Sequence, residues 1–153
     1  MDKLLTPTTV EDIDHLAPKL RKADKQECLA YTGQMPLSIL HTALLHGDIT
    51  LTLRTPQGKR IGICGVAPSP FDNAGVIWMC ATDAIMKHQM AFLRKSKAAL
   101  DYLGAEYDIL HNCVDARNTV HIKWLKWMGF HFIKKHEAYG VEQRPFYEFI
   151  RIK

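Results

Sequence analysis

The sequence predicts one α/β domain over residues 1–153, of the α+β kind, with a mixed central sheet of six to seven strands and helices beside it. Three observations lead to this fold class. Three short helical segments come before any long strand, a two-stranded hairpin follows, and the second half alternates strand, helix, strand and helix. The last order is typical of parallel strands joined by a crossover helix. No repeat, linker or change of composition divides the chain.

Capping signals mark the helices of the N-terminal part. A short first strand is expected at 3–6, and Thr8-Thr9-Val10-Glu11 reads as a capping box for a helix over 9–17. Asp24-Lys25-Gln26-Glu27 repeats the pattern and starts a helix that runs to Tyr31. A proline at 36 suits the first turn of a third helix, which ends near residue 45.

The periodicity then changes to that of strands. A hairpin is expected over 49–53 and 60–66, with a turn at Thr55-Pro56-Gln57-Gly58-Lys59. Near-continuous apolar runs at 76–81 and 109–114 indicate strands that are buried on both faces. A helix is expected over 90–103, between the two buried strands. Terminal strands are expected at 132–135 and 146–152.

The segment from Asp115 to Phe130 is the best-defined part of the sequence. A polar turn leads to Asn118, and apolar residues then recur at helical spacing while Lys123 and Lys126 fall on the other face. Gly129 closes this amphipathic helix.

The composition is that of an ordinary globular protein, with 47% hydrophobic and 24% charged residues. The apolar runs are far shorter than the roughly twenty residues of a membrane span, and the N-terminus has no signal-peptide layout, so we expect a soluble, cytoplasmic protein. The four cysteines are widely spaced without a Cys-x-x-Cys pair and are expected to be free thiols. Neither His-x-x-x-His nor another compact ligand set occurs among the eight histidines, so no metal site is predicted.

The net charge of +4 is concentrated in two basic clusters. Such clusters suit a solvated surface, a polyphosphate ligand or a nucleic acid. Nucleic acid is the least favoured of these and would show itself as a steep salt dependence of binding. The clusters consist of Lys87, His88, Arg94, Lys95 and Lys97, and of His131, Lys134, Lys135 and His136.

The order of elements, Asn118 and the Gly129-Phe130 exit resemble the Gcn5-related N-acetyltransferase (GNAT) superfamily, whose last helix lies beside the pantetheine arm of acetyl-CoA. Within this superfamily, the amino-acid sequence is similar to those of small phage proteins related to an internal virion protein of T7-like podoviruses. The stretches that carry this second resemblance are Leu20-Arg21-Lys22-Ala23-Asp24, Thr32-Gly33, Pro36, Gly65-Val66-Ala67-Pro68, Thr82-Asp83-Ala84, Phe92-Leu93-Arg94-Lys95-Ser96, Asp115-Ala116-Arg117-Asn118-Thr119, Trp124-Leu125 and Gly129-Phe130.

The GNAT resemblance implies transfer of an acyl group from acetyl-CoA to an amine by direct attack in a ternary complex. It also implies splayed central strands whose backbone at Ala81 and Val114 holds the thioester arm, with Asn118 beside the cofactor. The turn from Thr82 onward stands where the family binds pyrophosphate, but it lacks the family's spaced glycines. Four basic side chains are expected to compensate there: Lys87, His88, Arg94 and Lys95.

The family's usual general acid, a tyrosine seven residues after the asparagine, is replaced by Leu125. His121 and Tyr139, the latter in the loop after the sixth strand, are candidate substitutes. Asp83 and Asp115 are candidate general bases because they follow the two central strands directly. Each also has a structural reading: Asp115 as a partner of Arg117 or a helix cap, and Asp83 as a cap of the next turn.

A second function class remains open. The chain could be a non-catalytic phage protein that uses this fold to contact a host or phage protein, in the cytoplasm of an infected cell or in a virion, or to form a homodimer. The missing glycines and tyrosine favour this alternative, while Asn118 and the Gly129-Phe130 exit favour transferase chemistry.

Overall fold

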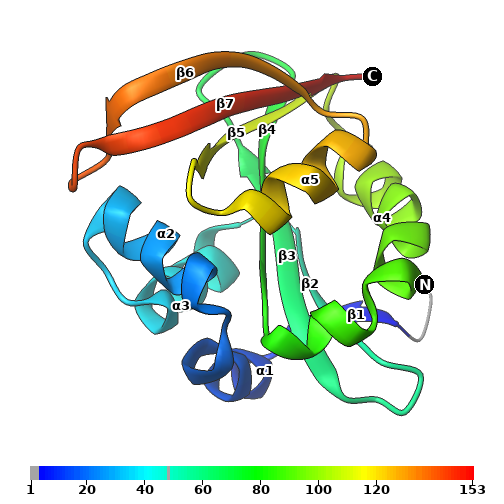
Figure 1. The fold of residues 1–153 in the computed structure, drawn as a ribbon. Coiled ribbons are helices and arrows are strands. Elements are labelled where there is room, and N and C mark those ends of the chain that lie inside the picture. Colours follow the sequence, from blue (N-terminus) through cyan, green and yellow to red (C-terminus); the bar gives the residue numbers. More distant parts are fainter. Residues whose placement is uncertain (1–3, 48) are drawn as a thin grey trace.

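The computed structural model describes residues 4–47 and 49–153, which form a seven-stranded mixed sheet with helices on both faces (Figure 1). The strand order is β1-β2-β3-β4-β5-β7-β6, and β4 and β5 form the parallel pair. This confirms the predicted fold class and the crossover. The strands are β1 (Leu5–Pro7), β2 (Ile49–Arg54), β3 (Arg60–Pro68), β4 (Ala74–Ala81), β5 (Ile109–Asp115), β6 (His131–Tyr139) and β7 (Arg144–Ile152).

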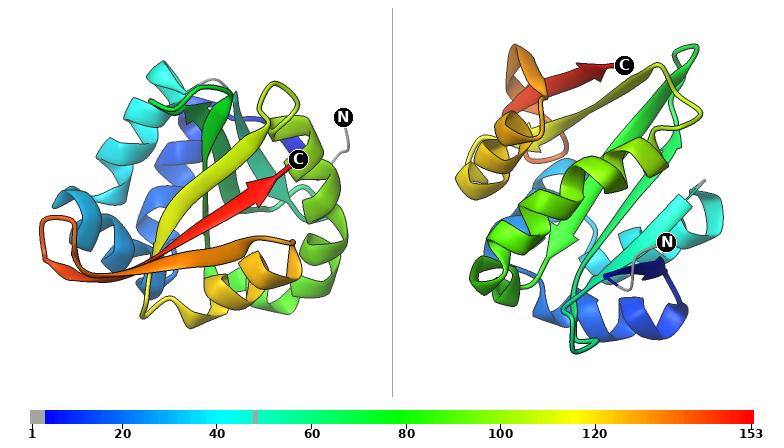
Figure 2. Two further views of the ribbon diagram at one scale, coloured as in Figure 1. Left: turned by 90° about the horizontal axis from the view of Figure 1, so that it is seen from above. Right: turned by 90° about the vertical axis from the view of Figure 1, so that its right-hand side faces the viewer.

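The helices divide between the two faces of the sheet (Figure 2). On one face lie α1 (Val10–Leu16), α2 (Lys22–Thr32) and α3 (Pro36–His46), and on the other lie α4 (Gln89–Leu103) and α5 (Thr119–Trp127). None of the helices among residues 4–47 and 49–153 combines the length and apolar character that crossing a bilayer requires.

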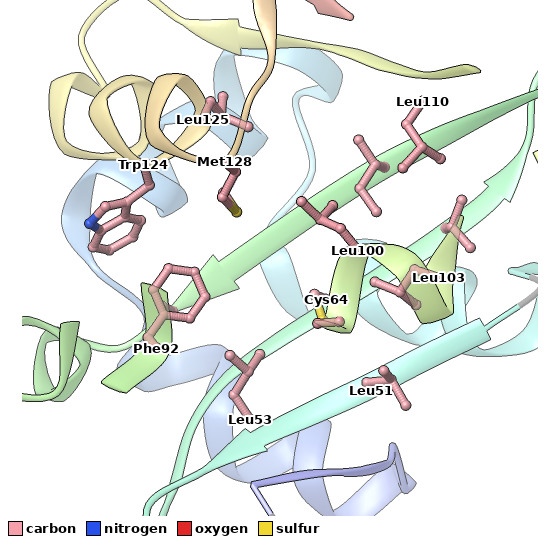
Figure 3. Close-up of a cluster of buried hydrophobic side chains, with 14 of the residues drawn as sticks. Leu51, Leu53, Cys64, Phe92, Leu100, Leu103, Leu110, Trp124, Leu125 and Met128 are labelled. Carbon is pink, nitrogen blue, oxygen red and sulfur yellow. The ribbon is translucent and has the colours of Figure 1, made fainter. Parts of the chain in front are cut away.

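The larger hydrophobic core lies between the sheet and the α4 and α5 helices (Figure 3). Phe92 of α4 meets Trp124 of α5 edge to face, with ring centroids 5.2 Å apart. Leucines of α4 then cover the strands beside them, as the helical spacing predicted. A smaller core lies on the opposite face, where α1 and α3 cover Ile63.

Several predicted boundaries move. The first strand is Leu5–Pro7, while Lys3 lies outside the described residues. The capping box of α1 uses Thr9 and Asp12, because Thr9 is the residue that takes the extended conformation of an N-cap. The prediction that α2 starts at Asp24 was wrong. This helix starts at Lys22, and the Asp24 carboxylate bonds to the Arg21 side chain and to Ala81 N–H of β4 instead of capping the helix.

Two further elements differ from the sequence prediction. The segment after β4 forms a 3-10 helix, η2 (Asp83–Lys87), before α4 begins. The last two strands are longer than predicted, so Tyr139 is the final residue of β6 and does not lie in a loop. Most residues of the edge strand β6 are exposed, on both of its faces, so there is little hydrophobic alternation to reveal its length.

The β6–β7 turn is fixed against the end of α2. The Val141 and Glu142 amides donate to the carbonyls of Tyr31 and Ala30, at 3.1 Å each. These bonds use carbonyl groups that have no partner within a helix's last turn. Gly140 directly precedes these two residues and has a φ of 70°, and a Cβ there would lie 2.5 Å from Ala30 O. The turn therefore needs glycine for both its conformation and its close approach.

We expect Gly140→Ala to cost about 2–3 kcal/mol of stability, measured by urea unfolding. The matched control is Gly58→Ala, because Gly58 also has a positive φ, 87°, but nothing lies within 4 Å of its added Cβ. The control should lose only about 1 kcal/mol, the cost of the left-handed conformation. Equal losses in both variants would show that the α2 contact contributes nothing.

Candidate active site at the gap between β4 and β5

The two central strands separate after a short paired stretch. Their parallel register covers Ala74, Gly75 and Val76 of β4 against Ile109, Leu110 and His111 of β5, and ends there. Both strands continue beyond this point, to Ala81 and Asp115. At the start of the gap the Asn112 amide donates to Ile77 O at 2.9 Å. Beyond that bond β4 and β5 diverge and are no longer paired with one another (Figure 2).

The ladder between β3 and β4 decides which backbone groups face the gap. Thr82 N–H donates to Ile61 O, which makes Thr82 a hydrogen-bonded partner of β3. Since directions alternate along an antiparallel strand, Ile77, Met79 and Ala81 turn their N–H and C=O groups away from β3. Ile77 O is already taken by Asn112. Met79 is thus the residue of β4 that presents its backbone groups in the middle of the gap.

A cavity of about 390 Å³ passes through this gap and reaches both faces of the sheet. On the α4 and α5 side most wall residues are apolar, with Lys95, Ser96 and His121 as the polar exceptions. On the α2 and α3 side they include the Glu27 carboxyl group and the Cys28 thiol. Trp124 is not part of the wall. Residues that line the cavity and carry polar or sulfur-containing side chains include Glu27, Cys28, Met79, Lys95, Cys113 and His121.

A buried polar network closes the wide end of the gap. Arg21 binds the Asp24 carboxylate through Nε and Nη2, at 3.2 and 3.0 Å, and Nη2 also donates to Asn118 Oδ1 at 3.0 Å. The guanidinium group lies over the Trp124 ring, 5.1 Å from its centroid. Asp24 Oδ2 accepts from Ala81 N–H, and Ala81 O accepts from Arg21 N–H. This network joins α2, β4 and α5.

Glu27 lies between that network and the cavity. Its Oε1 accepts hydrogen bonds from Asp115 N–H at 2.8 Å and from the Asn118 amide at 3.4 Å. Its Oε2 has no hydrogen-bond partner among the described residues. Burial, with a smaller contribution from the nearby Asp24 charge, raises the pKa of Glu27 to about 8. A carboxyl group with such a pKa can exchange a proton near neutral pH.

No family model and no curated protein matches this chain. Solved structures match nearly all of it. An acetyltransferase of the GNAT family from Bacillus anthracis has 9% identity and a TM-score of 0.73, with 97% of this chain and 93% of that chain covered. A GCN5-related N-acetyltransferase from Kribbella flavida has 15% identity and a TM-score of 0.69, with 97% and 96% covered. A ribosomal-protein-alanine N-acetyltransferase from Brucella melitensis has 13% identity and a TM-score of 0.64, with 98% and 99% covered.

This is the GNAT fold. The fold predicted from the resemblance is thereby confirmed, with seven strands and a central pair that splays. At such low identities the likeness concerns the fold and does not extend to substrate or activity. The similarity to phage proteins rests on short stretches of sequence and stays a prediction.

The four predicted catalytic residues occupy different surroundings. Asp83 is exposed at the start of η2. Asp115 is buried and pairs with Arg117 at 2.7 Å, which is its structural reading. His121 lines the cavity, but burial lowers its pKa to about 4, so the ring is neutral at pH 7 and a weak acid. Tyr139 packs edge to face on Tyr31, and burial raises its pKa.

The predicted cofactor residues fall into two groups. In the first, Lys87, His88, Arg94 and Lys95 lie together around the junction of η2 and α4, where His88 is the N-cap residue. The Lys87, Arg94 and Lys95 side chains are exposed, and Lys95 also reaches the cavity wall. No residue from 82 to 92 has a positive φ, which explains why this 3-10 turn needs none of the family's glycines.

The second group has little left to offer a ligand. The Ala81 backbone is bonded to Arg21 and Asp24, and Thr82 bonds through both N–H and Oγ1 to Ile61 O. Val114 turns its backbone toward β7, because Ala116 N–H bonds to Pro145 O and directions alternate from there. The Asn118 amide is engaged with Arg21, Asp24 and Glu27. Its place in the fold is to hold Glu27.

Sequence reasoning missed Arg21, Asp24 and Glu27 as parts of this site. Their spacing of three residues does place them on one side of α2. That signal was available, but it gave no indication that this side of the helix meets Ala81 and Asn118, which lie 57 and 94 residues from Asp24.

Proposed function

We propose that this protein transfers an acyl group from acyl-CoA to an amine, with the reaction taking place in the gap between β4 and β5. The observation that supports this most directly is the position of Glu27. It is a carboxyl group with a pKa near 8, held by two hydrogen bonds on one oxygen, beside a cavity that opens on both faces of a GNAT fold. An acyl donor on the α4 and α5 side and an amine on the α2 and α3 side would meet there.

The residues of the gap fit the thioester arm of an acyl-CoA. Met79 N–H can donate to the thioester carbonyl, where negative charge develops during attack. The mainly apolar walls from α4 and α5 suit the arm itself. The pyrophosphate would lie at the start of α4, where the exposed cations Lys87 and Arg94 and the amides of the first helical turn favour anions.

Glu27 would act as the general base. An amine reaches the gap mostly as an ammonium ion, and it must lose a proton before its nitrogen can attack. Oε2 takes that proton while Asp115 N–H and the Asn118 amide keep the carboxyl group in place through Oε1. The leaving thiolate needs no strong acid, since thiols have a pKa of about 8.5. This accounts for a site in which Leu125 replaces the family's tyrosine and His121 is neutral.

Calorimetric titration with acetyl-CoA tests the donor site. We expect saturable binding by the wild type and binding weakened by about tenfold to a hundredfold in the double variant Lys87→Ala/Arg94→Ala. The difference should shrink with added salt, because exposed charges are screened. Lys59→Ala, which removes an exposed cation in the β2–β3 turn, is the control and should bind as the wild type does. Equal affinity in the double variant would remove these two residues from the site.

One set of observations favours a second candidate function, a non-catalytic interaction module. Arg21 and Asp24 occupy the backbone groups of Ala81, and a 3-10 turn stands where the family has its glycines. The same titration separates the two candidates. No saturable binding at millimolar acetyl-CoA would favour the interaction module.

A further inference from the structure

A second polar cluster lies beside the gap, on the three strands at one side of the sheet. It consists of Cys113 on β5, Glu148 on β7 and His136 on β6. One ligand atom from each side chain, the thiol sulfur, a ring nitrogen and a carboxylate oxygen, lies within 4.8 Å of the other two. The proposed reaction uses none of these groups.

The strand register explains why these side chains converge. Cys113 and Glu148 are direct cross-strand partners, and the alternation that starts at Ala116 and Pro145 makes them a non-hydrogen-bonded pair. In such pairs the side chains are closest. His136 stands opposite Phe146, two residues from Glu148, and therefore shares its face of the sheet. Two register shifts in β6 on either side of His136 adjust its position.

The histidine nitrogen shows that the cluster is incomplete. His136 Nε2 is buried and has no hydrogen-bond partner. The nearest carboxylate oxygen, Glu148 Oε1, lies 3.8 Å away, which is beyond hydrogen-bond distance. A buried nitrogen of this kind normally has a partner, and leaving it unpaired costs free energy. An ion between the imidazole and the carboxylate would satisfy both groups.

We propose that Cys113, His136 and Glu148 form a binding site for a divalent transition-metal ion of the Zn²⁺ type. Sulfur, nitrogen and oxygen ligands together suit Zn²⁺ and disfavour Mg²⁺ and Ca²⁺, which take oxygen ligands. In a tetrahedral Zn²⁺ site the ligand atoms lie roughly 3.5 Å apart, so a contraction of about 1 Å closes the cluster. A thiolate and a carboxylate balance the charge of the ion, and three protein ligands leave one position open.

The surroundings of the sulfur bear on how the ion binds. Burial raises the pKa of the Cys113 thiol, and the nearby carboxylates of Glu148 and Glu27 act in the same direction, while a hydrogen bond with Tyr139 lowers it. Metal binding must displace the thiol proton, so binding should strengthen as pH rises. Cys113 also contributes to the wall of the cavity, which brings the ion next to the amine side of the gap. The proposed metal site does not depend on the proposed acyl-transfer activity.

The test uses the full chain after removal of metal, titrated with Zn²⁺ against a chromogenic chelator and with Co²⁺ by absorption. We expect one ion per chain, a thiolate-to-Co²⁺ charge-transfer band, and a rise in melting temperature with Zn²⁺. Cys113→Ser, His136→Ala and Glu148→Gln should each weaken binding by more than the 10–100-fold that loss of an outer-shell partner costs.

Cys28→Ser and His131→Ala are the matched controls, because they remove a thiol of α2 and an exposed histidine of β6, and both should bind as the wild type does. Circular dichroism checks that every variant is folded. The proposal is overturned if wild type binds no Zn²⁺ in the micromolar range, if the Co²⁺ complex lacks the thiolate band, or if the controls lose as much affinity as the three ligand variants.

Discussion

Glu27→Gln should lower kcat for acyl transfer by about 10²–10⁴-fold, the range that loss of a general base produces. Glutamine keeps the shape of the side chain and can still accept the hydrogen bonds from Asp115 N–H and the Asn118 amide, but it cannot take a proton. Acetyl-CoA binding should be unchanged, because Glu27 lies on the α2 side of the gap. Steady-state kinetics with a panel of primary amines measures the first effect, and the titration described above measures the second.

The pH profile gives Glu27 a signature that a merely structural residue would not have. Below about pH 8 the carboxyl group is protonated and cannot act as a base, so kcat/KM of the wild type should rise with pH and level off above that value. The Gln variant should lack this part of the profile. Any remaining rise in the variant reports the ionisation of the amine substrate.

Stability provides a readout of the same group without substrate. The pKa of Glu27 is raised from its ordinary value of 4.5 to about 8, so between these values the folded state binds more protons than the unfolded state. The free energy of unfolding should therefore fall as pH rises through this window, and the fall should be smaller in Glu27→Gln. A melting temperature with the same pH dependence in both proteins would show that Glu27 ionises normally, and the assignment as base would fail.

Asp83→Asn is the matched control for catalysis. Asp83 is the base candidate suggested by its position after β4, but it is exposed at the start of η2. We expect the Asn variant to retain at least about half of the activity. Should Asp83→Asn lose activity while Glu27→Gln retains it, the sequence-based candidate would be correct and the structural one wrong.

Arg21→Ala should destabilise the protein by about 3–5 kcal/mol, the cost of breaking a buried ion pair. Arg21 and Asp24 are 5% and 1% exposed, and their contact is bidentate. Removing the guanidinium group leaves the Asp24 carboxylate buried without its charge partner and takes a donor from Asn118. Urea unfolding followed by circular dichroism measures the loss. The ends of α2, β4 and α5 should loosen together, which hydrogen exchange at Ala81 would report.

Two further variants interpret this result. Lys22→Ala removes an exposed cation at the next position and should change stability by less than about 0.5 kcal/mol. Arg21→Lys keeps the charge but loses the bidentate geometry and the stacking on Trp124, so its loss should be intermediate. If Arg21→Ala is as stable as Lys22→Ala, the network contributes nothing and the wide end of the gap is held by other contacts.

Local patterns predicted the elements of this fold well where one residue's environment depends on its neighbours in the sequence. The periodicity of 119–127, the apolar runs at β4 and β5 and the glycine at 129 each predicted the element that is found. Edge strand β6 was underestimated, because exposed residues on both of its faces leave little hydrophobic alternation. Asp24 was assigned as a cap because it fits a local capping pattern. Its actual partners are Arg21, Ala81 and Asn118, and the pattern gives no information about the two that are distant in the sequence.

The candidate site divides along the same line. The sequence by itself determined the element order, the clustering of basic residues around the start of α4, and the presence of Asn118 at the start of α5. Only the tertiary structure decided that Glu27 meets Asp115 and Asn118, and that Cys113, His136 and Glu148 share one face of the sheet. The physical reason is that desolvation and hydrogen bonding, which set the pKa of Glu27, depend on groups up to 91 residues away along the chain.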